Sequence, residues 1–169
     1  IGTLAKNHYR DEKIMIISSD KDFLQLQKYF NVEQFSPTQK KMLVSKDPNG
    51  YLREHIMKGD RGDGIPNFLS DDDTFVTDKR SKKVLSTKLK AWVGLDPYEF
   101  CNEKMLRGYK RNEQLVDLAC TPVDIKQKIV DQYKEYEYNQ RDKLLNYFIK
   151  NNMSKIIIIG AGAMCSAYA

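Results

Sequence analysis

Residues 14–26 read IMIISSDKDFLQL, and this stretch decides how the first part of the chain folds. Its apolar start, after a charged stretch, predicts a strand over 12–18 that is buried on both faces of a parallel sheet. Parallel α/β sheets place their functional groups just beyond the carboxyl ends of their strands. Asp20 and Asp22 lie at that position, where the strand leads into a predicted helix over 21–28.

These two aspartates admit two interpretations. Asp is a favourable N-cap residue, so Ser-Ser-Asp before a helix satisfies free backbone N–H groups with no further role. Two neighbouring carboxylates also repel each other, and a divalent cation would offset the repulsion. Mg²⁺ takes oxygen ligands and commonly binds one or two carboxylates. The segment alone leaves both interpretations open.

The length of 169 residues allows one ordinary domain or two small ones, with a buried core. The longest fully apolar run, Ile156–Ile159, is far too short to cross a membrane. Cys101, Cys120 and Cys165 lie far apart, with no spacing typical of zinc or of a disulfide framework. They predict free cysteines in a reducing, cytoplasmic compartment.

The pattern of the chain changes near Asp47. Before it, a predicted helix over 1–10 and strand candidates at Val32–Phe35 and Met42–Ser45 give the βα alternation of a parallel sheet. After it, Asp47–Gly50 is predicted to be a turn, and apolar residues then recur at helical spacing. We interpret these apolar stripes as the core of a helical domain. N-cap, proline and acid follow one another at 96–99 and again at 121–124, which predicts two helix starts.

Basic residues gather in two clusters. The first holds six cations and no acid, namely Lys79, Arg80, Lys82, Lys83, Lys88 and Lys90, and the second holds Lys104, Arg107, Lys110 and Arg111. Such stripes suit a phosphate backbone, because each neutralised phosphate releases counterions. A solvated helix face in a lysine-rich protein is the alternative.

A second group of acids lies in the glycine-rich segment 58–66, which reads KGDRGDGIP. Glycine permits positive φ angles and a close approach of the backbone to a partner. Asp and Gly are also ordinary residues of a surface turn. Together with Asp20 and Asp22, however, Asp60 and Asp63 suggest two-metal phosphodiester chemistry, which needs carboxylates from several segments.

The order of these motifs resembles that of the 5′-nuclease (flap endonuclease) family, and most of all its phage members. The motifs are Ser-Ser-Asp20-Lys-Asp22-Phe-x-Gln-Leu after the strand, then Phe35-Ser-Pro, then Lys58-Gly-Asp60-x-x-Asp63. The resemblance runs from the first residues to about Lys155 and includes Tyr147-Phe-Ile-Lys near the end.

The resemblance implies an α/β fold with a partial parallel-sheet, PIN-like nuclease core over 1–46. A helical domain over 47–155 would follow, with a helix-three-turn-helix element around Gly59–Phe75 that holds a duplex by its phosphates. The remaining residues, 156–169, form a tail outside the resemblance. The tail imitates a dinucleotide fingerprint but lacks the third glycine and room for a following helix.

The resemblance also implies a chemistry. Phage members act as Mg²⁺-dependent 5′-to-3′ exonucleases or flap endonucleases that remove RNA primers during DNA replication, and Mn²⁺ substitutes for Mg²⁺. By position, Asp20 would belong to the tighter metal site, and Asp22 and Asp63 would serve the second metal. Asp60 would support the same carboxylate cluster.

The implied partners are a DNA flap or an RNA–DNA hybrid, bound through Lys58, Arg61 and the first basic cluster. A single-stranded DNA-binding protein or a sliding clamp is the expected protein partner. Neither a membrane nor a nucleotide cofactor is expected, and a phage-encoded enzyme would work in the cytoplasm of the bacterial host.

The sequence departs from the family pattern in two places. Where many members have a Gly-x-Gly hairpin and a lysine, residues 67–73 read NFLSDDD, which is acidic. The amino-terminal acids of the family, including a Glu-x-x-Asp-Asp run, do not precede Ile1. The chain is therefore expected to be the carboxyl-terminal part of a nuclease and inactive by itself. A non-catalytic nucleic-acid-binding module is the alternative.

Overall fold

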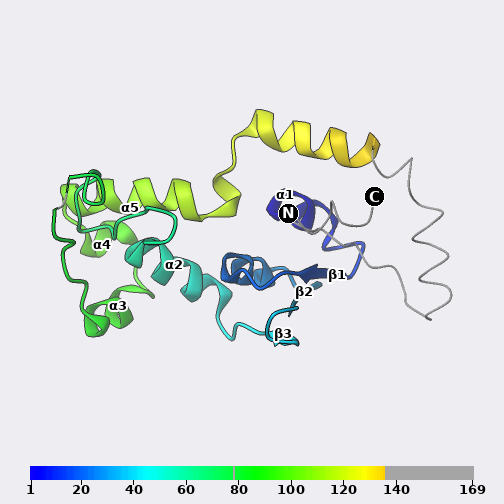
Figure 1. Ribbon diagram of the computed structural model, residues 1–169, viewed down its shortest axis with the longest axis horizontal. Coiled ribbons are helices and arrows are strands. Elements are labelled where there is room, and N and C mark those ends of the chain that lie inside the picture. The colour runs from blue at the N-terminus through cyan, green and yellow to red at the C-terminus, as the bar shows by residue number, and fades with distance from the viewer. Residues whose placement is uncertain (78, 136–169) are drawn as a thin grey trace. The chain divides into compact units, whose positions relative to one another are not determined.

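A computed structural model describes residues 1–77 and 79–135 and divides the chain into two compact units (Figure 1). The first unit comprises Ile1–Lys46 and Thr121–Ala169, and the second comprises Asp47–Cys120. The predicted domain boundary also falls between Lys46 and Asp47. The prediction assigned all of 47–155 to the second domain, and this extent stays a prediction; of its described residues, 121–135 group with the first unit.

The first unit contains a three-stranded sheet in the order β1-β2-β3. Its described elements are helix α1 (Gly2–His8), β1 (Ile14–Ile17), the 3₁₀ helix η1 (Lys21–Lys28), β2 (Val32–Ser36) and β3 (Lys41–Leu43). β1 and β2 are parallel, with Ile14 opposite Val32 and Ile17 opposite Phe35. Residues 123–135 are helical, as the sequence predicts from Thr121-Pro122.

The expectation of a purely parallel sheet is wrong at β3, which pairs with β2 in the antiparallel direction. Only four residues, 37–40, connect the two strands. A parallel pair needs a crossover of about a dozen residues or more, so this connection permits only a hairpin. Lys40 adopts a φ of 51° within the connection.

The expectation that β1 is buried on both faces is also wrong in this chain. Ile14 and Ile16 are fully buried, whereas Ile17 is 37% exposed. Successive side chains of a strand point to opposite faces, and η1 packs against the sheet through buried Phe23 and Leu26. The alternation of buried and more exposed residues along β1 therefore indicates that only one face of the sheet is well covered at this strand.

The second unit is helical, as predicted. Its elements are α2 (Pro48–Lys58), α3 (Ser86–Trp92), α4 (Pro97–Phe100), α5 (Glu103–Val116) and the 3₁₀ turn η2 (Leu118–Cys120). α2 packs against α5 (Figure 1). The core contains Leu52, Ile56, Leu89 and Tyr109 from the predicted apolar stripes, together with Met57, Phe68 and Val116, which the sequence analysis does not assign to them.

Two local predictions need correction. The predicted turn at Asp47–Gly50 is the first turn of α2, because Asp47 is its N-cap and accepts a hydrogen bond from the Gly50 N–H at 2.8 Å. Residues 59–77 contain turns and no regular helix, so no helix lies within the expected helix-three-turn-helix range Gly59–Phe75, and α2 ends just before it. The end of the predicted helical domain, 136–155, and the tail 156–169 lie outside the described residues. Within the described part of the chain, no helix is long and apolar enough to cross a membrane.

Candidate nucleic-acid interface

The first pair of aspartates lies where β1 ends. The Asp20 carboxylate accepts a hydrogen bond from the Asp22 N–H at 2.9 Å and caps η1. The capping interpretation is therefore confirmed. The cap uses the Oδ1 atom of Asp20. Because Asp20 is exposed at the end of the strand, capping and metal binding are compatible.

A buried side chain that was not predicted from the sequence holds this turn in place. Gln34 of β2 is fully buried, and its amide Nε2 donates to the main-chain oxygens of Ser18 at 2.9 Å and Asp20 at 2.6 Å. The hydroxyls of Ser19 and Ser36 lie 2.8 Å apart. The alternation of side chains along β2 could have indicated this role, because it places Gln34 and Ser36 on the same inward face as Val32.

The second pair of aspartates lies in the predicted loop after α2. Asp60 Oδ1 accepts hydrogen bonds from the N–H groups of Gly62 at 2.7 Å and Asp63 at 3.3 Å. His55 Nε2 lies 3.4 Å from Asp60 Oδ2. Burial favours the neutral form of Asp60, but the hydrogen bonds from Asp63, Gly62 and His55 outweigh it and hold the pKa of Asp60 below its usual value. Asp60 thus organises the loop, while Asp63 is exposed.

Glycine is required where α2 turns into this loop. Gly59 has a φ of 66°, and a Cβ at this position would lie 2.4 Å from the Ile65 carbonyl oxygen. α2 accordingly ends at Gly59, which is its C-cap.

Cations from two segments line one cavity of about 600 Å³ beside this loop. Lys58 and Arg61 come from the end of α2 and its loop, and Lys79 and Arg80 come from the stretch before α3. No acid is among the described residues that line it, and its other walls are formed by Ile65, Asn67, Thr74, Phe75 and Ser81. We call this the cationic pocket.

The cationic pocket gathers four of the eight residues predicted to bind nucleic acid. Lys82, Lys83, Lys88 and Lys90 do not line it. Residues 79–85 are extended rather than helical, so these cations do not share one helix face. The ammonium group of Lys88 lies 5.6 Å from the centre of the Trp92 ring.

The four pocket cations differ in their partners. Lys58 pairs with Glu54, and Lys79 Nζ lies 2.7 Å from Asp73 Oδ2, a hydrogen bond that raises the pKa of Lys79. Within the described parts of the chain, the side chains of Arg61 and Arg80 have no hydrogen-bond or ion-pair partner. An unpaired guanidinium is well suited to a phosphate, which it can contact through two parallel N–H groups.

Two neighbouring residues of α5, Arg111 and Asn112, hold the loop after α2 by hydrogen bonds to main-chain oxygens. The buried amide of Asn112 donates to the carbonyl oxygens of Ile56 at 2.8 Å and Pro66 at 2.9 Å. Arg111 donates to Pro66 at 3.0 Å and Asn67 at 3.3 Å. The sequence places Arg111 in the second basic cluster, but its guanidinium binds main-chain oxygens of the loop and so stabilises the fold.

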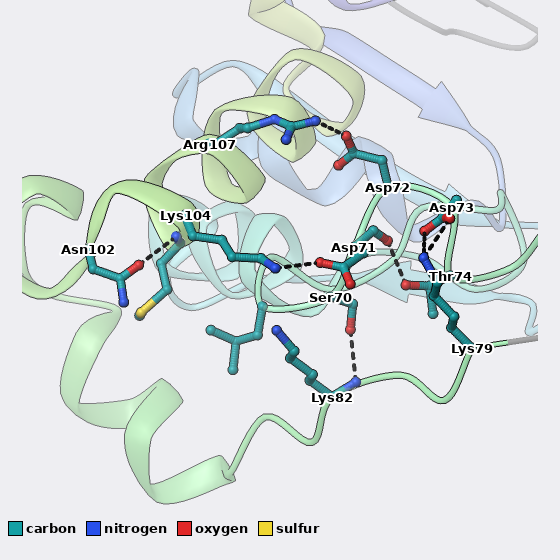
Figure 2. Close-up of polar contacts among 12 residues, drawn as sticks. Ser70, Asp71, Asp72, Asp73, Thr74, Lys79, Lys82, Asn102, Lys104 and Arg107 are labelled. Atoms are coloured by element: carbon teal, nitrogen blue, oxygen red, sulfur yellow. Dashed lines mark hydrogen bonds and ion pairs between the residues drawn. The ribbon is translucent and has the colours of Figure 1, made fainter. Parts of the chain in front are cut away.

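The acidic run Asp71–Asp73 is paired with basic residues of the same unit (Figure 2). Asp71 lies 2.8 Å from Lys104, Asp72 pairs with Arg107 and Arg111, and Asp73 pairs with Lys79. The sequence shows that these acids depart from the family pattern, but it does not show which basic residues pair with them.

The predicted metal ligands come from both units, Asp20 and Asp22 from the first and Asp63, supported by Asp60, from the second. Within the described residues of either unit, no three His, Cys, Asp or Glu side chains gather as a metal site. The metal site therefore stays a prediction, and it requires carboxylates from more than one segment.

Comparison with known proteins gives two matches. The family model described as "T4 RNase H, C terminal" matches residues 49–159, a few residues beyond the expected end at Lys155. Ribonuclease H of Enterobacteria phage T4 is 32% identical over 151 residues, which cover 85% of this chain and 50% of that protein. The chain thus spans about half the length of this curated relative.

Proposed function

This chain belongs to the T4 RNase H family of 5′ nucleases, and from that premise we propose that it binds the phosphate backbone of nucleic acid in the cationic pocket. The intact nuclease would use this grip to position a DNA flap or an RNA–DNA hybrid for cleavage. The observation that carries the proposal is the convergence of Lys58, Arg61, Lys79 and Arg80 on one cavity, with no acid among the described residues of its wall.

The physical basis is electrostatic. A nucleic-acid backbone presents closely spaced phosphates, and each phosphate that a cation neutralises releases counterions. Asn112 and Arg111 hold the main chain at Pro66, next to Ile65 and Asn67 of the pocket wall.

We further propose Mg²⁺-dependent phosphodiester hydrolysis, with Asp20, Asp22 and Asp63 as metal ligands and Asp60 as the residue that shapes the loop of Asp63. The exposed carboxylate of Asp20 and the half-buried carboxylate of Asp22, just after β1, fit the oxygen ligands that Mg²⁺ or Mn²⁺ prefers. When bound, the metals would activate a water molecule and stabilise the charge that develops on the phosphate.

The nucleic-acid proposal is tested with two double variants of equal charge change. In Arg61→Gln/Arg80→Gln, both unpaired cations of the pocket are lost. In Lys83→Gln/Lys90→Gln, two exposed cations outside the pocket are lost. Fluorescence anisotropy with a labelled DNA duplex should show about tenfold weaker binding for the first variant and little change for the second. Equal weakening by both variants would favour a diffuse basic surface over the pocket.

The metal proposal needs a variant that leaves the helix cap intact. Asp20→Asn keeps a side-chain oxygen for the Asp22 N–H but removes the charge. Mn²⁺ should broaden the NMR signals of residues near Asp20 in the wild type and much less in Asp20→Asn. Asp11→Asn, at an exposed acid of the same unit, is the control. Broadening that persists in Asp20→Asn would instead favour the alternative, a non-catalytic nucleic-acid-binding module.

A further inference from the structure

The acidic run Asp71–Asp73 presents three consecutive carboxylates to cations from two segments (Figure 2). Asp71 lies 2.8 Å from Lys104 Nζ, Asp73 Oδ2 lies 2.7 Å from Lys79 Nζ, and Asp72 contacts Arg107. Lys104 and Arg107 are one turn apart on α5 and lie on the wall of a cavity of about 610 Å³ that the three acids also line.

The cations of this surface are solvent-accessible. The side chains of Lys104, Arg107 and Lys79 are 68%, 77% and 52% exposed. Side-chain contact with Lys104 lowers the pKa of Asp71, and contact with Lys79 lowers the pKa of Asp73. Both acids therefore stay ionised at neutral pH, and the cations already bind anionic oxygen.

The fold of this segment rests mainly on main-chain contacts, to which Asp72 adds an ion pair with Arg111. Arg111 binds the main chain at Pro66, Asn67 and Ser70, and the Ser70 hydroxyl accepts the Lys82 N–H at 2.9 Å. The Thr74 N–H and hydroxyl bond the main-chain oxygen of Asp71, not its side chain. Exposed ion pairs contribute little to folding stability, so a phosphate can displace these carboxylates at small cost.

We propose that Lys79, Lys104 and Arg107 form a second phosphate-binding surface, which the acidic run occupies as a competing anion. This inference rests on the proposed nucleic-acid function and deepens it. The backbone of a bound nucleic acid reaches the surface only by displacing the three carboxylates. Lys79 also lines the cationic pocket, so a strand held in the pocket can extend onto this surface.

The test removes the competing charges but keeps the size and hydrogen-bonding oxygen of each side chain. The triple variant Asp71→Asn/Asp72→Asn/Asp73→Asn should bind a labelled DNA duplex more tightly than the wild type at low salt. If three further phosphates are contacted, its affinity should fall about 40-fold more than that of the wild type between about 50 and about 200 mM salt.

A matched triple variant controls for net charge. Asp11→Asn/Glu33→Gln/Glu99→Gln removes three exposed acids elsewhere and should leave the salt dependence unchanged. A gain as large in this control would overturn the inference, because net charge alone would then explain the effect.

A second pair of variants keeps the inference testable if the triple variant folds poorly. Lys104→Gln/Arg107→Gln should abolish the gain produced by Asp71→Asn/Asp72→Asn, because the two cations that the acids release are then absent. A gain of the same size without these two cations would contradict a phosphate-binding surface at Lys104 and Arg107.

The outcomes separate this inference from the proposed function. If Arg61→Gln/Arg80→Gln weakens binding but removal of the acidic run does not strengthen it, the second surface is wrong and the cationic pocket stands. If neither the wild type nor any variant binds duplex, the proposed function itself fails.

Discussion

The buried face and the exposed face of α5 have different roles in the second unit. On its buried face, Gly108 and Asn112 pack against the loop that follows α2, through contacts closed to water. On its exposed face, Lys104 and Arg107 pair with the acidic run in full contact with solvent. Buried contacts determine the fold, whereas exposed pairs determine which charges a ligand meets. Changes on the buried face should therefore affect stability, and changes on the exposed face should affect affinity.

Asn112→Ala should cause the largest loss of stability among changes on the buried face of α5. The substitution removes the buried amide that binds the carbonyl oxygens of Ile56 and Pro66; Pro66 keeps its bond from Arg111, whereas Ile56 loses its side-chain donor. An unsatisfied buried acceptor is costly, so we expect a loss of about 3 kcal/mol in the free energy of unfolding. Urea titration measures it, with Gln114→Ala on the exposed side of α5 as the control. A loss below about 1 kcal/mol would mean that other groups satisfy the two carbonyls.

Gly108→Ala tests the close packing of the same face. A Cβ at this position would lie 2.1 Å from the Phe68 carbonyl oxygen, so α5 and the loop would have to move apart. Alanine is favoured over glycine in a helix by about 1 kcal/mol, but overpacking against backbone should outweigh this gain. We expect a net loss of about 2 kcal/mol on denaturant unfolding.

Gly94→Ala is the matched control, because nothing lies within 4 Å of a Cβ built there. We expect its stability to be unchanged or slightly increased. If both alanine variants behave alike, the contact of Gly108 with Phe68 does not limit the packing.

The Asp60 loop should give a smaller, pH-dependent effect. The pKa of Asp60 is lower in the folded chain than in the unfolded chain, so its charge stabilises the fold above the unfolded pKa of about 3.9. This contribution is lost as pH falls through the folded pKa. Asp60→Asn should therefore be less stable than the wild type near pH 6, and the difference should shrink toward pH 3. A difference that is constant over this range would show that the charge of Asp60 has no role.

The smallest effect is expected on the exposed face of α5. Asp71→Asn removes the pairing charge of Lys104 but leaves the main-chain bonds of the segment in place. The midpoint of thermal unfolding should not change measurably. A clear fall in this midpoint would place the acidic run among the elements that hold the fold.

Part of this architecture could be predicted from the sequence. Asp96-Pro97 and the glycine at position 59 predict a helix start and a helix end because their chemistry is local. The apolar stripes of α2 and α5 predict the core of the second unit for the same reason. The direction of β3 was mispredicted because strand direction depends on the connection and on the partner strand.

Polar side chains at the candidate sites were harder to predict. Arg111 and Arg107 look alike in the sequence, yet one binds main-chain carbonyls and the other faces solvent. Their difference arises from the loop that packs against α5, which no local pattern encodes. Gln34 is similar, since its role depends on the turn that ends the neighbouring strand.

The most direct test of pocket binding is an NMR titration of the whole chain with a DNA duplex, followed residue by residue through backbone amide shifts. We predict that the largest shifts fall at 58–67 and 74–81, around Arg61 and Arg80, while the amides of Lys104 and Arg107 shift little at low duplex concentration. Largest shifts at 103–107, or an even spread over both units, would contradict the central claim that unpaired cations in the pocket bind first.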